Sequence, residues 1–409
     1  MQANAIIVDP YLGASDFATA FAARNVTPMA VFSTARPLDS MAWAPELWAN
    51  VLFYDGDFEA LAATVKSYDP LGIVPGNEAG VELAGELTET LMPALANVPG
   101  MAPAQRDKGR QYEALAAAGV PHLRNICSSD AAEVTDWIAD SCLSDKALVV
   151  KPPKSAGTDS VHLIRPGANW RPCFDAILGE VNLMGVLNEA VMVMEYAEGP
   201  EFMVDTYSVN GRHGLAMVSI YGKHNRGDRL GIYDMGETLH PADPRTAELF
   251  AYTTRVADAV GIRNASGHTE VILASEGPRL VEIAARFSGS CMQIHQQIST
   301  GDCQIDRAVR HYLDGAYEPY YRMVTPARTA WLSAHSAGRL ADTDALETVR
   351  DLPTFARAKL PQPGTLVAST VDIDTSLGWV ILASDDQAAI EADYARIREL
   401  EAQLVFTPE

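Results

Sequence analysis

The segment His268–Ser290 limits the folds open to this chain more than any other stretch of its sequence. Two short apolar runs, Val271–Leu273 and Leu280–Ile283, flank the polar stretch Ser275–Pro278. Apolar runs separated by a Gly-Pro turn are typical of a β-hairpin, because Gly and Pro favour the backbone angles of tight turns. The segment is therefore predicted to form a hairpin, and any core must be built against it.

Carboxylates occur where this hairpin should be apolar. Glu270 begins the first run, Glu282 lies inside the second, and Arg286 follows four residues later. Strict alternation predicts Leu280 and Glu282 on one face of the second strand, with Val281 and Ile283 on the other. A carboxylate in an apolar strand is costly unless it is paired or bound to a cation. Two of them beside an arginine indicate a site for Mg²⁺ and phosphate, and the alternative is a pair of solvated acids at the strand rim.

Length and composition indicate a globular protein of several domains. The chain has 409 residues, of which 48% are hydrophobic and 21% charged, so two or three domains are expected. No uncharged apolar run reaches the roughly 18 residues that a membrane span needs. The N-terminus lacks the basic region of a signal peptide, and no such peptide is expected.

Net charge limits the partners that this protein can bind, and cysteine content indicates the compartment in which it works. The chain carries 31 Lys and Arg against 53 Asp and Glu, a net charge of −22. This charge repels nucleic acid over most of the surface, so a phosphate site must be built locally. The 5 cysteines are widely spaced without a CxxC pair, which favours a reduced, cytoplasmic protein.

The N-terminal hundred residues alternate between strand and helix patterns, which predicts a parallel sheet with helices on both faces. The strands are expected at residues 5–8, 29–32, 51–54 and 71–74. From residue 327 the pattern changes. Strands are expected at 329–335, 365–375 and 379–383, and helices at 343–351 and 386–403.

Lysines stand at two positions suited to a phosphate chain. Lys108 follows the helix N-cap Asp107, where a lysine is less usual than at a helix C-terminus. Lys151 ends a predicted strand and precedes the small-residue loop 152–160, whose N–H groups could close over phosphates. A solvated hairpin tip is the alternative for this loop.

Three acids, Glu195, Glu198 and Glu201, lie in a predicted turn between two strands. They could accept hydrogen bonds from an adenine amino group or ribose hydroxyls, or they could form a solvated turn. Downstream, the segment Lys223–Gly236 is predicted to be a basic loop near the site. Such a loop would suit a substrate with an extra carboxylate.

With these pieces in order, the chain resembles the ATP-grasp superfamily of carboxylate–amine ligases, and within it most closely the L-amino-acid ligases that make dipeptides. The resemblance covers nearly the whole chain and is carried by RDKGRQYEALAAAGVP, ALVVKPPKSAGTDSVHLI, MEYAEGPEFMVD and HTEVILASEGPRLVEIAARFSG. It implies an α/β (α+β multidomain) ATP-grasp fold. The implied parts are a pre-ATP-grasp domain at 1–100, an ATP-grasp domain at 101–325 with subdomains near 120–195 and 196–325, and a small C-terminal domain at 326–409.

The resemblance also implies roles for individual residues. Glu270 and Glu282 would be Mg²⁺ ligands that, with Arg286, form the catalytic set. ATP would be bound by Lys108, Lys151, Gly157, Glu195, Tyr196, Glu198 and Glu201, with Glu195 on the adenine amino group, the backbone of Tyr196 and Glu198 on the ring edge, and Glu201 on the ribose. Substrate contacts would come from Arg286, Ser288, Gly289 and His268.

One position departs from the superfamily pattern. Many ATP-grasp enzymes have Asn two residues after the second metal Glu, whereas this chain has Ala284. Two Mg²⁺ ions are expected, with the geometry of the second in question.

The implied reaction is ATP-dependent joining of one amino acid's carboxylate to another's amine through an acyl phosphate. The alternatives are a ligase of this fold that uses a γ-glutamyl or non-amino-acid carboxylate, and a non-catalytic ATP-binding protein. The expected partners are small-molecule amino acids, and a homodimer is one assembly left open.

Overall fold

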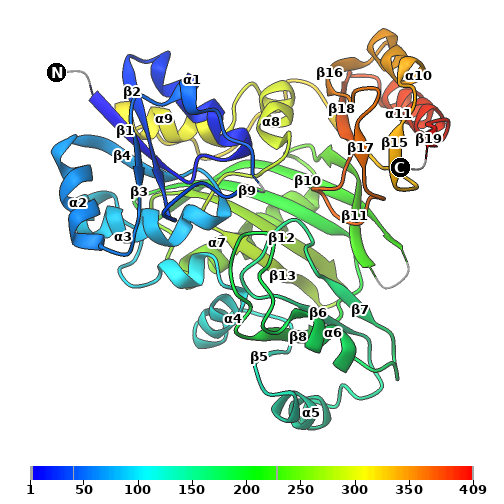
Figure 1. The fold of residues 1–409 in the computed structure, drawn as a ribbon, viewed down its shortest axis with the longest axis horizontal. Helices are drawn as coiled ribbons and strands as arrows, with labels where there is room; N and C mark the ends of the chain where they lie inside the picture. The colour runs from blue at the N-terminus through cyan, green and yellow to red at the C-terminus, as the bar shows by residue number, and fades with distance from the viewer. Residues whose placement is uncertain (1–2, 40, 227–228, 408–409) are drawn as a thin grey trace.

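A computed structural model of the chain describes residues 3–39, 41–226 and 229–407. The N-terminal part is a four-stranded sheet in the order β3-β2-β1-β4, and all of its pairings are parallel, as predicted (Figure 1). Its strands and helices are β1 (Ala3–Val8), β2 (Val26–Phe32), β3 (Val51–Phe53), β4 (Pro70–Pro75), α1 (Ser15–Ala22), α2 (Phe58–Ser67) and α3 (Val81–Leu91).

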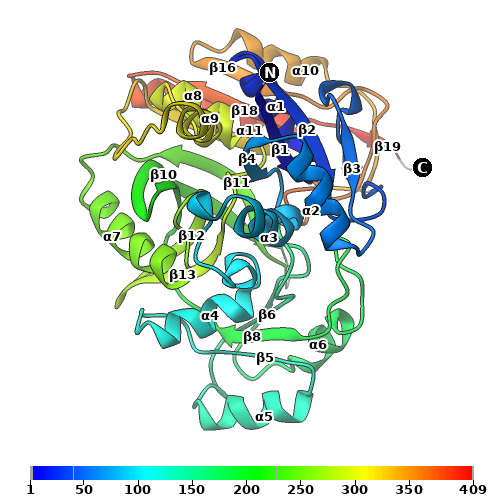
Figure 2. The same ribbon diagram turned by 90° about the vertical axis from the view of Figure 1, so that its left-hand side faces the viewer.

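Both faces of this sheet are covered, which explains why β1 is apolar at consecutive positions. Ile7 packs with Phe17 of α1 in a cluster that also includes residues of α9 (Gln304–Asp314). Ile6 and Val8 face the opposite way and pack with residues of α2 and α3. The sheet therefore has helices on both faces, and α9 joins it to the rest of the molecule (Figures 1 and 2).

The remaining core strands form one large sheet in the order β13-β12-β9-β10-β11-β7-β6-β8-β5, and these neighbours pair antiparallel. Its first half comprises β5 (Asn125–Ser128), β6 (Leu148–Lys151), β7 (His162–Ile164) and β8 (Val191–Glu195), with α5 (Ala131–Asp140) and α6 (Arg171–Ile177). Its second half comprises β9 (Glu201–Val209), β10 (Arg212–Arg226), β11 (Arg229–Thr238), β12 (Ser266–Ala274) and β13 (Gly277–Ala284).

Helices fix the second half of this sheet in place. On α7 (Pro244–Ala259), Leu249 and Val256 pack in one cluster with Val271, Leu280 and Ile283 of the β12–β13 hairpin. On α4 (Lys108–Ala117), capped by Asp107 as predicted, Tyr112 donates a hydrogen bond to the Leu280 carbonyl. The apolar side of the hairpin is thus buried, and its other side faces inward between the two halves of the sheet. Helix α8 (Met292–Thr300) follows the hairpin.

The C-terminal region continues the large sheet. Strand β14 (Ala327–Leu332) pairs with β11 through Ala330 opposite Met235, and it also pairs with β18 (Gly378–Ala383), which pairs with β16 (Phe355–Lys359). Helix α11 (Gln387–Glu401) covers these strands, with α10 (Asp344–Glu347) beside it. A separate three-stranded sheet contains β15 (Gly338–Leu340), β17 (Leu366–Val367) and β19 (Phe406–Thr407) (Figure 1).

Two expectations for local structure were wrong, and one, the helix at 343–351, was right only in part. The strand predicted at 365–375 is only Leu366–Val367, because Thr375 and Asp372 bond each other in a compact turn. The helix predicted at 343–351 is split into α10 and a 3₁₀ turn. The predicted loop at 223–236 is mostly strand, in β10 and β11, and its residues 227 and 228 lie outside the described residues.

Among the helices in the described parts of the chain, none combines the length and apolar character that a bilayer crossing requires. The domain boundaries at residues 100 and 325, and the subdomain boundary near 195, stay predictions.

Candidate active site

Two cavities meet at the β12–β13 hairpin. The first cavity, of about 790 Å³ with its open mouth included, lies between the β6–β8 side and the β9–β13 side of the large sheet. Seven of the residues predicted for nucleotide and metal line it together with Gly157, namely Lys108, Lys151, Glu195, Tyr196, Glu201, Glu270 and Glu282. Leu123, Val149, Met194, Leu230 and Ile272 supply its apolar walls. The cavity therefore combines an apolar slot with a charged end.

The two carboxylates reach this cavity because of a β-bulge. Glu270 pairs with Glu282, but Val271 pairs with Leu280, so Val281 is an extra residue in β13. Leu280 and Ile283 both pack into the core. The predicted alternation, which put Leu280 and Glu282 on one face, was wrong for this reason. The bulge turns Glu282 toward the cavity beside Glu270.

Lys108 and Glu282 form a buried ion pair with 2.8 Å between Nζ and Oε2, and Lys108 also donates to the Ser155 carbonyl at 2.6 Å. Burial opposes the charge on each group. Glu282 and Glu78 outweigh burial at Lys108 and raise its pKa. Lys108 and Lys151 outweigh burial at Glu282 and lower its pKa to about 2. Both groups are therefore charged at neutral pH.

Lys151 is held differently. Its Nζ donates only to the Val281 carbonyl, at 3.2 Å, among the hydrogen bonds of the described residues. Burial, together with the nearby Lys108 charge, lowers the pKa of Lys151 to about 8. Without a carboxylate partner of its own, this buried lysine is suited to accept an anion.

Lys223 is a site residue whose role sequence reasoning missed, since it was read only as part of a basic loop. Its Nζ donates to Glu201 at 2.6 Å, lies 3.6 Å from Glu270, and sits over the Tyr221 and Tyr233 rings. Burial opposes its charge, but Glu201 and Glu270 raise the pKa of Lys223 above its ordinary value. An alternating strand pattern that continues through residue 223 could have revealed that Lys223 faces inward.

The acidic turn is only partly in the cavity. The Glu195 carboxylate accepts a hydrogen bond from the Arg124 Nε at 2.7 Å. The Tyr196 N–H donates to the Ala147 carbonyl. Glu198 is exposed and outside the cavity lining. The structure thus brings Glu201 to the charged end, leaves the Glu195 carboxylate engaged elsewhere, and does not bring in Glu198.

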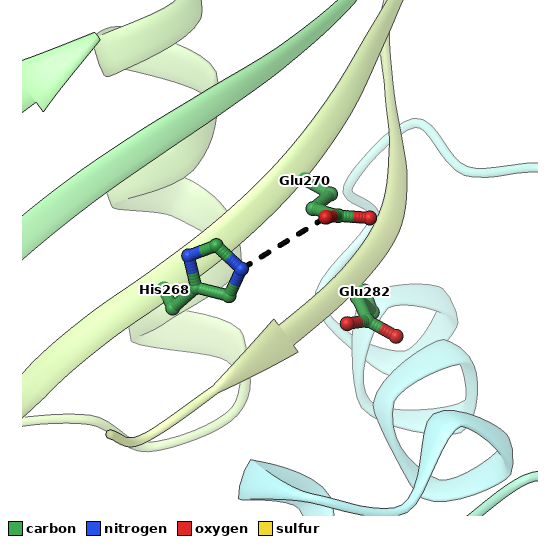
Figure 3. Close-up of side chains that lie close together, drawn as sticks. All are labelled: His268, Glu270 and Glu282. Carbon is green, nitrogen blue, oxygen red and sulfur yellow. Dashed lines mark ion pairs between the residues drawn. The ribbon is translucent and has the colours of Figure 1, made fainter. Parts of the chain in front are cut away.

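Glu270, Glu282 and His268 form a cluster that could hold a cation, with one ligand atom of each within 4.8 Å of the others (Figure 3). The His268 Nδ1 lies 2.9 Å from Asp205, and its Nε2 lies 3.9 Å from Glu270. His268 is opposite Ala284 in the strand register, so the small residue at 284 leaves room for the imidazole. Two convergent carboxylates are the hard oxygen donors that Mg²⁺ prefers, so these residues fit the ion.

The second cavity, of about 1080 Å³ with its open mouth included, lies on the other side of the carboxylates. It shares Gly157, Glu270 and Glu282 with the first cavity. Further wall residues come from both ends of the chain, namely Tyr11, Leu12, Met41, Glu78, Trp331, Ile373 and Asp374. The carboxylate pair therefore stands at the junction of the two cavities.

Arg286 and Glu78 place opposite charges in this second cavity. The Arg286 Nε donates to Glu78 at 2.7 Å, and both side chains are nearly buried. Burial opposes the charge, but Glu78 and Glu282 raise the pKa of Arg286 further. Gly289 and His268 also line this cavity, and their predicted contact with the substrate stays a prediction. Glu78 follows β4, and the N-terminal sheet brings it into this cavity.

Ser288 does not line either cavity. It is buried and bonded to Gln304, Gln293 and Gln296, so the substrate contact predicted for it was wrong. The polar network around Ser288 instead holds the loop that follows Arg286.

Comparisons with known proteins agree with this geometry. A family model described as "ATP-grasp domain" matches residues 144–294, which include both the small-residue loop 152–160 and the β12–β13 hairpin. Dapdiamide A synthase of Enterobacter agglomerans is 26% identical over 407 residues, covering 97% of this chain and 95% of the relative. The chain therefore contains an ATP-grasp domain over residues 144–294. It is an enzyme that joins a carboxylate to an amine with ATP, and a C–N bond is formed.

Solved structures share the fold over the full length. An L-amino acid ligase from Bacillus licheniformis superposes with a TM-score of 0.77 at 17% identity, covering 100% of this chain and 99% of that one. A carboxyaminoimidazole ribonucleotide synthase from Aspergillus clavatus, complexed with ATP, gives 0.72 at 14% identity, covering 99% and 100%. The predicted fold class is confirmed, and the alternative of a non-catalytic ATP-binding protein is set aside.

The depressed pKa of Lys151, about 8, predicts pH-dependent nucleotide binding by this ligase. The protonated lysine attracts phosphate and the neutral one does not. ADP affinity should therefore stay level below pH 8 and fall above it by up to about tenfold, toward the affinity of a variant that lacks the charge. Calorimetric titration with ADP from pH 7 to 9.5 measures this.

Lys151→Ala should bind about tenfold more weakly with a flat profile, and the exposed Lys66→Ala should match the wild type. Unchanged affinity in Lys151→Ala would rule out its phosphate role.

Proposed function

We propose that this ligase activates the carboxylate of one amino acid as an acyl phosphate and transfers it to the amine of a second, giving a dipeptide, ADP and phosphate. The observation that carries the proposal is the shared wall of the two cavities. Glu270 and Glu282 face both, so a phosphate chain in the first and a carboxylate in the second would meet there.

The first cavity suits ATP. Its apolar slot would take the adenine ring, Glu201 the ribose, and Lys108 and Lys151 the phosphates. Glu270 and Glu282 would hold Mg²⁺, which when bound neutralises charge on the β- and γ-phosphates. Gly157, at φ +68°, allows close packing of the loop, since a Cβ there would lie 2.8 Å from Ile373. A closed loop would keep water from the acyl phosphate.

The second cavity suits a zwitterion. Arg286 would bind a substrate carboxylate through its remaining donors, and Glu78 would bind an ammonium group. A carboxylate oxygen attacks the γ-phosphorus, and the bond to the ADP oxygen breaks. The second amino acid's amine, after losing a proton, attacks the acyl carbon, and a C–N bond replaces the C–O bond to phosphate. Arg286 is placed to stabilise the oxyanion formed on the way.

The name of one similar protein, an L-amino acid ligase, supports amino-acid substrates. The alternative of a substrate with an extra carboxylate loses one argument, because Lys223 is already paired with Glu201.

The deciding experiment measures phosphate release from ATP and Mg²⁺ against a matrix of paired amino acids, with mass spectrometry of each active well. A product lighter than the two amino acids by one water is expected, and its fragmentation should show an α-linkage. A γ-linkage would favour the side-chain carboxylate alternative. If no pair of amino acids gave phosphate release while the protein still bound ATP, the assignment of amino-acid substrates would be overturned.

A further inference from the structure

Asp159 connects the loop beside the first cavity to a wall of the second. It belongs to the glycine loop, residues Ser155–Ser160. Within the loop its Oδ2 accepts from the Ser155 hydroxyl at 2.7 Å, and its Oδ1 accepts from Ser160 at 3.0 Å. Outside the loop, Oδ2 also accepts from the Leu183 N–H at 3.1 Å. The carboxylate of Asp159 therefore accepts hydrogen bonds both from the glycine loop and from the segment that contains Leu183.

The second segment, which we call the wall segment, is Asn182–Val186. The Asn182 side-chain oxygen accepts from the backbone N–H groups of Met184 and Val186, so the segment is a compact turn. Leu183 and Met184 line the second cavity. Met184 is buried in the cluster that contains Tyr11 of the N-terminal part. The wall segment thus lies between the glycine loop and the N-terminal sheet.

The shape of the glycine loop depends on such bonds. Thr158 and Ser160, on either side of Asp159, have φ values of 66° and 53°. Residues other than glycine are disfavoured in this left-handed region, because their Cβ comes too close to the following carbonyl oxygen. A charged acceptor that bonds groups at both ends of the loop offsets this strain. The position of Asp159, and with it the Leu183 N–H, therefore follows the conformation of the loop.

We propose that Asp159 is a positioning residue that makes closure of the glycine loop over nucleotide place the wall of the amino-acid cavity. The proposal rests on the function assigned above to the two cavities. When nucleotide draws the loop in, Asp159 fixes Leu183 and Met184 against the bound amino acid. Activation and enclosure then occur together, so the acyl phosphate is formed only in a cavity from which water is excluded.

Hydrogen exchange tests this without knowledge of the substrate. Saturating Mg²⁺ and AMP-PNP, an ATP analogue with a non-cleavable β–γ link, should slow exchange in peptides covering 155–160 and 182–186 of the wild type. In Asp159→Ala, the glycine-loop peptide should still be protected and the wall-segment peptide should not. Ser160→Ala removes a bond within the loop but leaves the bond to Leu183, so it should protect both peptides.

Activity supplies a second readout. A hydrogen bond to a charged group is worth enough to shift binding at least about tenfold. At saturating ATP, Asp159→Ala should raise the KM for the amine substrate at least about tenfold and release phosphate in excess over ligated product, while the KM for ATP changes less than about threefold. A loop that simply misfolds would raise the KM for ATP as much.

The possible outcomes distinguish a failure of this coupling from a failure of the function proposed for the two cavities. Equal protection of both peptides in Asp159→Ala and the wild type, with phosphate and product still equal, would overturn the coupling alone. A wild-type glycine loop that AMP-PNP does not protect would overturn the nucleotide assignment and the coupling with it.

Discussion

Glu282→Gln should lower phosphate release by about a thousandfold. The side chain is at the junction of the two cavities, its pKa of about 2 keeps it ionised, and its Oε2 lies 2.8 Å from the Lys108 Nζ. Glutamine keeps the shape and an acceptor oxygen but loses the charge that would hold Mg²⁺. Stabilisation of transferred-phosphoryl charge by a metal ion is worth several kcal/mol, and each 1.36 kcal/mol is a factor of ten.

Glu276→Gln is the matched control, because Glu276 is exposed at the turn of the same hairpin. It should release phosphate at the wild-type rate. Circular dichroism should show the wild-type spectrum for both variants, so that a loss of activity is not a loss of fold. A Glu282→Gln enzyme that keeps activity within about threefold of the wild type would show the metal assignment to be wrong.

Arg286→Lys should lower kcat by about a hundredfold and leave nucleotide affinity unchanged. The guanidinium uses its Nε for Glu78 and its Nη1 for the Phe287 carbonyl, which leaves further donors for a ligand. Lysine keeps the charge, but its single ammonium cannot hold Glu78 and an oxyanion in the same geometry. Removal of one oxyanion donor in other enzymes lowers kcat by about 10²–10³.

Arg279→Lys provides the comparison, because Arg279 lies on β13, the strand that ends two residues before Arg286. Among the bonds of described residues, it bonds only backbone carbonyls of the hairpin turn. Its kcat should equal that of the wild type. Steady-state kinetics and calorimetric titration with ADP separate the two effects. If Arg286→Lys weakens ADP binding as strongly as it slows turnover, Arg286 serves the nucleotide rather than the substrate.

Sequence reasoning located the groups whose chemistry is visible within a few residues. The carboxylates of the hairpin, Lys108, Lys151 and the loop around Gly157 stand in local patterns that a single sequence displays, and the structure brings them into one cavity. The bulge at Val281 was not predictable, because it depends on which residue of β12 each residue of β13 faces.

Contacts between residues that are far apart in the chain could not be predicted either. Glu78 and Arg286 are separated by 208 positions, and only the packing of the N-terminal sheet brings them together. Lys223 was read as part of a basic loop because its partners, Glu201 and Glu270, belong to other strands. Ser288 follows Arg286 closely in sequence, yet its neighbours in space are three buried glutamines.

The two cavities take their wall residues from different parts of the chain, and this difference has an evolutionary consequence. Among the described residues, the lining of the first cavity comes entirely from the stretch between Lys108 and Glu282. The second cavity also draws on Tyr11 and Met41 near the start and on Trp331 and Asp374 near the end. Mutations in either terminal region can thus diversify which molecules are joined while the machinery that consumes ATP is inherited intact.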